Sequence, residues 1–175
     1  MFTADMLSYF DRSILCWLAT VDASGMPNVS PKEVFAPWQQ KDLLIAHIAS
    51  PGSIHNLRTN PKACVSFIDV FVQKGYKVKG EASIVEKKDR RYEALKKPLL
   101  EIAGGQFPIQ AIIYIRTETT EPIIAPSYRL FPKQSEQFRI ERAMRTYGVM
   151  PRNLKLQTLA YEDHDPASSH QQTDD

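Results

Sequence analysis

The most informative stretch for chemistry is Ser50-Pro51-Gly52-Ser53, which follows an apolar run. Ser50 is a favoured helix N-cap and Pro51 suits a first helical position, so a short helix is expected to begin here. The start of a helix offers unpaired backbone N–H groups and a partial positive charge, which together attract anions. Gly52 lets a ligand approach the backbone closely, and the two serine hydroxyls can add hydrogen bonds. The turn indicates an anion site, with an ordinary capped helix as the competing interpretation.

A second unusual stretch, residues 28–32, combines a strand pattern with a proline and a lysine. Pro31 cannot donate to a strand ladder, so it indicates a sheet edge, a bulge or an opening toward a ligand. Lys32 follows directly and can place a positive charge beside an anionic or electron-rich ligand. The competing interpretation is a solvated lysine at a strand edge, and the residues alone leave both open.

Histidine and cysteine give weaker signals. His47 ends an apolar strand pattern beside the anion turn, where a ligand contact is one of two open interpretations, and His55 has the setting of a surface residue. Neither has a carboxylate or a second histidine at ligand spacing, so no metal site and no catalytic dyad is expected. Cys16 and Cys64 each lie in an apolar run without a CxxC pattern, which is typical of buried, reduced thiols.

Short apolar runs and turns alternate along the chain and define the elements that must position these candidates. Strict alternation over residues 76–85 is typical of a half-buried strand, and residues 22–25 have the composition of a hairpin turn. The other expected strands are residues 14–21, 28–36, 43–48, 62–69, 109–116 and 122–125. The expected helices are residues 3–12, a short helix between Ser50 and Pro61, residues 88–103 and residues 135–147.

Six or seven strands with frequent antiparallel connections predict a mainly β fold, an antiparallel split β-barrel with peripheral α-helices. The loops between the strands are too short for a parallel βαβ sheet. The chain also contains neither GxGxxG nor GxxxxGK[ST], so a dinucleotide-binding or P-loop fold is not expected.

Length and composition bound the remaining possibilities. The 175 residues suit one domain, which we expect over residues 1–158 with the helix at 135–147 included, followed by a polar, disordered tail at 159–175. The net charge of +2 argues against nucleic acid as a partner. No apolar run approaches the ~20 residues of a membrane span, and the first residues do not follow a secretory signal pattern. A cytoplasmic protein without a membrane partner is therefore expected.

Taken in order, these motifs resemble the pyridoxamine 5′-phosphate oxidase-like family of FMN-binding split barrels, over roughly residues 3–118. The resemblance is closer to small members of the family than to the vitamin-pathway enzyme. It rests on the ordered series Leu18-Ala19-Thr20-Val21, Pro27-Asn28-Val29-Ser30-Pro31-Lys32, Leu44-Ile45-Ala46-His47, Ser50-Pro51-Gly52-Ser53, Asn56-Leu57-Arg58-Thr59-Asn60-Pro61 and Gly75-Tyr76-Lys77-Val78-Lys79-Gly80.

The resemblance implies a homodimer that binds FMN in a groove between its subunits. Residues 28–32 would follow the isoalloxazine and the ribityl chain, residues 46–47 would contact the flavin or ribityl, and the turn at residues 50–53 would hold the phosphate. The partner subunit would contribute from residues 76–79 and 127–129. The cofactor-binding residues that the resemblance implies are Asn28, Val29, Ser30, Lys32, Ala46, His47, Ser50, Gly52, Ser53 and Asn56.

Two departures from the vitamin-pathway oxidases limit the implied reaction. Those enzymes carry an Arg-Lys pair in the phosphate turn, where this chain has Gly52-Ser53, so phosphate binding would depend on backbone and hydroxyl donors. Their C-terminal basic motif for pyridoxal phosphate has no convincing counterpart in residues 151–159. Oxidation of pyridoxamine phosphate is therefore not the expected reaction.

Two functions from different classes remain open at this point. The first is a flavoprotein oxidoreductase that passes electrons between a reduced nicotinamide or another donor and a small-molecule acceptor, with FMN, or a deazaflavin in its place, supplying the chemistry. The second is a non-enzymatic protein that holds flavin or haem on the same fold. Haem would need an axial ligand, for which His47 and His55 are the candidates. A barrel that binds single-stranded nucleic acid would need a basic, aromatic-rich groove, for which there is little support.

Overall fold

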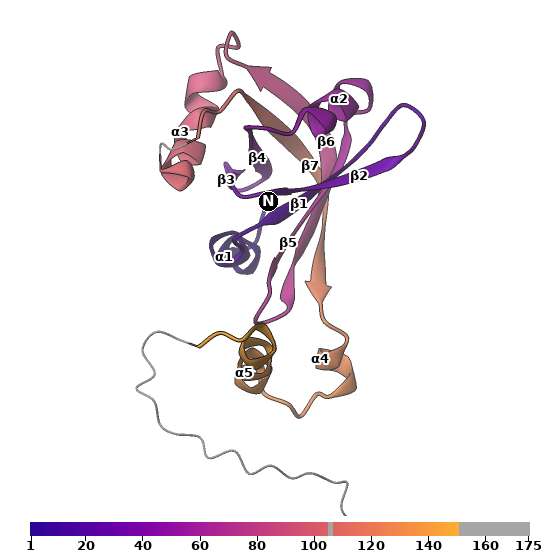
Figure 1. The fold of residues 1–175 in the computed structure, drawn as a ribbon, viewed down its shortest axis with the longest axis vertical. Coiled ribbons are helices and arrows are strands. Elements are labelled where there is room, and N and C mark those ends of the chain that lie inside the picture. The colour runs from indigo at the N-terminus through magenta and orange to yellow at the C-terminus, as the bar shows by residue number, and fades with distance from the viewer. Residues whose placement is uncertain (105–106, 151–175) are drawn as a thin grey trace, which may run out of the picture.

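The computed structural model describes residues 1–104 and 107–150 and contains one seven-stranded antiparallel sheet, in the order β2-β1-β5-β6-β7-β4-β3 (Figure 1). The sheet curls around a buried core, which confirms the predicted mainly β split barrel with peripheral helices. Its strands are β1 (Cys16–Val21), β2 (Pro27–Lys32), β3 (Phe35–Trp38), β4 (Asp42–His47), β5 (Lys62–Asp69), β6 (Lys74–Glu86) and β7 (Ala111–Ile124).

The helices lie outside the strands, and the first and last begin after residues that the sequence favours as caps. Thr3 accepts a hydrogen bond from the backbone N–H of Met6 and so caps the first helix, as Ser135 caps the last by accepting from Phe138 N–H. The helices are α1 (Ala4–Arg12), α2 (Pro51–Thr59), α3 (Tyr92–Ala103), α4 (Ser127–Leu130) and α5 (Glu136–Tyr147).

Two clusters of apolar side chains hold these layers together. The larger cluster fills the barrel and joins α1 and α2 to the strands, with Phe10 of α1 stacked on Phe67 of β5 at 4.3 Å between ring centroids. The smaller cluster lies between α3 and the opposite face of the sheet, around Tyr92, Leu95 and Leu99. The two clusters cover both faces of β4 and of the first part of β7, so packing fixes these strands from both sides.

Three predicted boundaries are corrected by the structure. The strand expected over residues 28–36 is two strands at opposite edges of the sheet: β2 pairs only with β1, and β3 pairs only with β4. Pro31 and Pro37 lack the N–H of a central strand, and edge strands tolerate that loss. The strands expected at 109–116 and 122–125 are one, β7, because β6 pairs along its whole length with a bulge between Lys79 and Gly80. The third helix begins at Tyr92 and continues through Pro98.

Strands β5, β6 and β7 extend past the rest of the sheet, and α4 and α5 lie at their far end (Figure 1). The predicted helix at 135–147 is thus confirmed as α5, while α4 was not predicted. The expected domain boundary at residue 158 and the tail at 159–175 lie outside the described residues. Across the described ranges, no helix combines the length and apolar character that crossing a bilayer requires.

Candidate functional site

The site is organised around Lys32, at the end of the edge strand β2. This lysine is only 6% exposed, and its Nζ donates hydrogen bonds to Ser50 Oγ at 2.7 Å and to Ser30 Oγ. Both partners are neutral hydroxyls, and Lys32 forms no ion pair within residues 1–104 and 107–150. Burial lowers the pKa of Lys32. The described part of the protein therefore holds a desolvated cation without a counter-anion.

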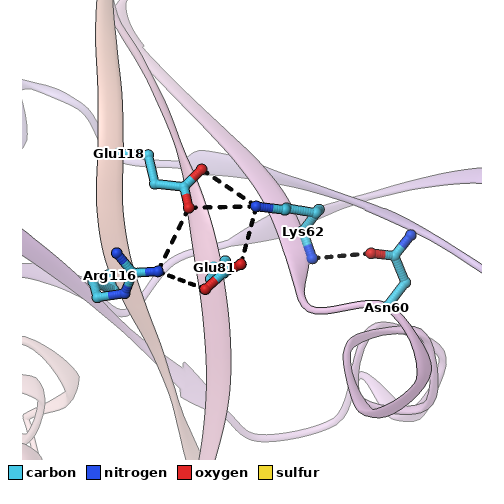
Figure 2. A network of polar contacts seen from close by, with 5 residues as sticks. All are labelled: Asn60, Lys62, Glu81, Arg116 and Glu118. Atoms are coloured by element: carbon cyan, nitrogen blue, oxygen red, sulfur yellow. Dashed lines mark hydrogen bonds and ion pairs between the residues drawn. The ribbon is translucent and has the colours of Figure 1, made fainter.

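Lys62, an exposed lysine at the start of β5, shows the usual arrangement. Lys62 donates to Glu81 at 3.0 Å and to Glu118 at 3.3 Å, and both carboxylates also pair with Arg116 (Figure 2). These hydrogen bonds raise the pKa of Lys62. In Lys62 the charge is exposed and compensated, whereas in Lys32 it is buried and uncompensated. Lys32 is thus unusual in being both buried and without a carboxylate partner in the described residues.

The first turn of α2 supplies further donors next to Lys32. Ser50 is the N-cap residue, but its hydroxyl accepts from Lys32 and does not cap the helix. The backbone N–H groups of Gly52 and Ser53 lie in the first turn, where no intrahelical carbonyl is available to them. A Cβ added at Gly52 would meet nothing within 4 Å, so the space beside this backbone is open. Ser53 is buried, and its Oγ has no partner in the described structure.

Buried hydrogen bonds fix α2 against the first hairpin. Thr20 Oγ1, in β1, accepts from Asn56 Nδ2 at 3.1 Å and from Asn28 Nδ2 at 3.3 Å. Asn28 and Asn56 are two of the predicted cofactor residues, and the structure brings them together but uses their amides within the protein. Thr20 was missed by the sequence reasoning. Its signal is a hydroxyl at the inward position after Cys16 and Leu18, in a strand whose buried residues alternate.

The two residues at the end of β4 face different pockets. Ala46 lines a pocket of about 210 Å³ together with Lys32 and Ser50. His47 lines a larger, open pocket of about 580 Å³ together with, among others, His55 and Arg58 of α2. Ala46 therefore lines the same pocket as Lys32, whereas His47 lines a different one.

His47 is held in the neutral form near pH 7. Burial lowers its pKa below the usual 6.5, and the charges of Lys32 and Arg58 lower it further. Its buried Nδ1 has no hydrogen-bond partner in the described structure. A neutral imidazole with a free nitrogen can accept a hydrogen bond or ligate a metal centre.

The remaining candidates differ in their surroundings. Val29 is 57% exposed, and neither Val29 nor Gly52 lines either of the two pockets. Cys16 is fully buried and burial raises its pKa, while Cys64 is only partly buried; both thiols are free. Within the described ranges, no three His, Cys, Asp or Glu side chains gather closely enough to hold a metal ion.

Comparison with known proteins places this geometry in context. Residues 2–140 match the family model described as pyridoxamine 5′-phosphate oxidase. The HupZ protein of Group A Streptococcus is 30% identical over 69% of this chain and 92% of its own, with a TM-score of 0.60. HutZ of Vibrio cholerae, named a haem storage protein, is 25% identical over 71% of this chain and 95% of its own, with a TM-score of 0.53.

A third similar structure supports the fold alone. It is an FMN-binding protein from Syntrophomonas wolfei, 17% identical over 69% of this chain and 88% of its own, with a TM-score of 0.58. Comparison with curated protein sequences gives no match.

Proposed function

We propose that this chain, which belongs to the pyridoxamine 5′-phosphate oxidase family, binds FMN and holds its phosphate between Lys32 and the first turn of α2. The observation that carries the proposal is the buried ammonium of Lys32, which has hydroxyl partners but no carboxylate partner in the described structure. A buried cation is costly unless it is paired, and an anionic ligand would supply the missing charge.

The donors around Lys32 fit a phosphate group. The Ser30 and Ser50 hydroxyls lie at the ammonium, and Ser53 has a buried hydroxyl without a partner among the described residues. The helix start adds backbone N–H groups, which bind phosphate in many proteins. The family resemblance implies that Lys32 lies along the isoalloxazine and the ribityl chain, whereas its hydrogen bond to Ser50 favours a place beside the phosphate. We therefore assign Lys32 to the phosphate in this proposal.

The remaining candidates would surround the other parts of the cofactor. Ala46 shares a pocket with Lys32, so it is suited to contact the ribityl chain or the ring, whereas His47, at the end of β4, would meet the cofactor only from the larger pocket that it lines. Asn28 and Asn56 would act by positioning, because their amides hold α2 against the hairpin through Thr20. When bound, FMN supplies hydride or electron transfer, and the protein orients it and tunes its electrostatic environment.

The reaction we propose is electron transfer between a small-molecule donor, such as a reduced nicotinamide, and a small-molecule acceptor. Oxidation of pyridoxamine phosphate is not part of the proposal. The phosphate turn has Gly52-Ser53 in place of an Arg-Lys pair, and the segment that would carry the basic substrate motif, residues 151–159, lies outside the described residues.

A homodimer with FMN at the interface completes the proposal. Its support is the exposed apolar surface around the first hairpin, on the edge of the sheet that carries Lys32. Side chains of this kind are uncommon on an isolated surface and are typical of subunit contacts. They are Ile14, Trp17, Met26 and Val29.

The test is direct. The protein as purified should show a flavin absorbance spectrum that a reductant bleaches, or should acquire it when FMN is added. Size-exclusion chromatography with light scattering should give the mass of a dimer. A colourless protein that fails to bind added FMN would refute the flavin proposal whatever its oligomeric state.

One observation favours a second candidate, haem binding. The neutral imidazole of His47, with a free Nδ1, lines the larger pocket together with His55, and HutZ, named for haem storage, is among the similar structures. Haem binding would give an intense band near the blue end of the visible spectrum. This band should be lost in His47→Ala or His55→Ala, whereas Lys32→Met should leave it in place.

A further inference from the structure

A second cationic pocket lies at α5, between Gln73, which precedes β6, and Ser127 of α4; these two helices lie at one end of the sheet (Figure 1). Its volume is about 280 Å³, and no carboxylate is among the side chains that line it. Hydrogen-bonding and cationic side chains dominate its wall: Gln73, Ser127, Arg139, Arg142, Thr146 and Tyr147.

Arg139 is the buried cation of this pocket. It is only 5% exposed, and its Nη2 donates to the carbonyl oxygens of Phe131, at 2.8 Å, and Gln134, at 3.4 Å. Its Cζ lies 4.1 Å from the ring centroid of Tyr128, which holds the guanidinium in one plane. The buried Nε has no partner in the described structure. Arg139 is thus held in place by neutral groups, namely two carbonyl oxygens and the Tyr128 ring.

An acidic side chain of the same helix already has a cationic partner. Glu136, in the first turn of α5, accepts from Lys74 Nζ at 2.6 Å, and that lysine also lies over the Tyr128 ring, 4.2 Å from its centroid. Neither Arg139 nor Arg142 forms an ion pair anywhere in the described residues. Arg142, one turn further along α5, lines the same pocket with an exposed side chain.

We propose that this pocket binds a small molecule through an oxyanion group, a carboxylate or a phosphate. The guanidinium fork matches the geometry of both groups, and two unpaired arginines would neutralise the charge. The pocket is smaller than the usual site of a cofactor-sized ligand, so it suits a compact anion. Arg142, Thr146 and Tyr147 follow residue 140, where the family match ends, while Arg139 lies within the matched segment.

The experiment is calorimetric titration of the full-length protein with inorganic phosphate and, separately, with malonate. The Lys32→Met background removes the anion site proposed for FMN. In this background, Arg142→Gln removes a pocket charge at an exposed position. Arg145→Gln is the matched control, because Arg145 lies on the same helix, is exposed and does not line the pocket.

Binding of at least one anion should weaken about tenfold or more with Arg142→Gln and stay unchanged with Arg145→Gln. Binding of phosphate alone identifies a phosphate-bearing ligand, and binding of malonate alone identifies a carboxylate. The proposal is overturned if neither anion binds at about 1 mM, or if both arginine variants weaken binding equally. FMN binding should be unaffected by Arg142→Gln in the wild-type background, so the two sites can fail independently.

Discussion

Replacing Lys32 with methionine tests the phosphate site most sharply. Methionine keeps most of the side-chain volume and removes the ammonium that donates to Ser30 and Ser50. Hydrogen bonds from a charged donor contribute roughly 1.5–3 kcal/mol. The dissociation constant of FMN should therefore rise by about 10- to 150-fold.

The same substitution should not destabilise the protein without ligand. Burial lowers the pKa of Lys32 below its usual 10.5, which means that folding disfavours the charged form. The unfolded chain then binds this proton more tightly, so the stability of the wild-type protein should rise as the pH increases through the folded pKa toward 10.5. Lys32→Met should lack this rise and should be at least as stable as the wild type near pH 7.

The assay is a titration that follows quenching of FMN fluorescence, combined with urea unfolding at pH 7 and pH 10. Lys62→Met is the matched control, because it removes the same charge from an exposed lysine whose partners are carboxylates (Figure 2). It should leave FMN affinity unchanged. An unchanged FMN affinity in Lys32→Met would refute the phosphate assignment. A large loss of stability without ligand would show that the lysine is structural.

Three further predictions address the surroundings of this lysine. Gly52→Ala should leave the stability of the ligand-free protein unchanged or raise it by up to about 1 kcal/mol, because the added Cβ meets nothing within 4 Å; thermal unfolding checks this. Gly52→Asp should abolish FMN binding, which an FMN titration checks. Because burial lowers the pKa of His47, stability should fall as the pH decreases below about 6.5, and urea unfolding should show a weaker fall in His47→Gln. Thr20→Val should cost roughly 1–3 kcal/mol in urea unfolding, because the Asn28 and Asn56 amides lose their acceptor.

Local chemistry explains which parts of the site the sequence predicts. Ser50 and Pro51 act within one turn of helix, and the edge position of Pro31 follows from a missing N–H, so neighbouring residues are sufficient for both. The hydrogen bond from Lys32 to Ser50 joins two elements that are 18 residues apart, and its existence depends on the order of strands in the sheet. The same is true of the hydrogen bond from Asn56 to Thr20, which forms because α2 lies over the first hairpin.

The division of the predicted strand at 28–36 has a functional consequence. Because β2 and β3 lie at opposite edges of the sheet, the chain must leave β2 directly after Lys32. The lysine side chain at that exit can reach the start of α2, which follows β4. A continuous strand would instead have kept β2 and β3 in one ladder. The crossing between the two edges therefore explains the place of the buried cation. A neutral ligand would not offset the cost of burying this charge, whereas a phosphate would.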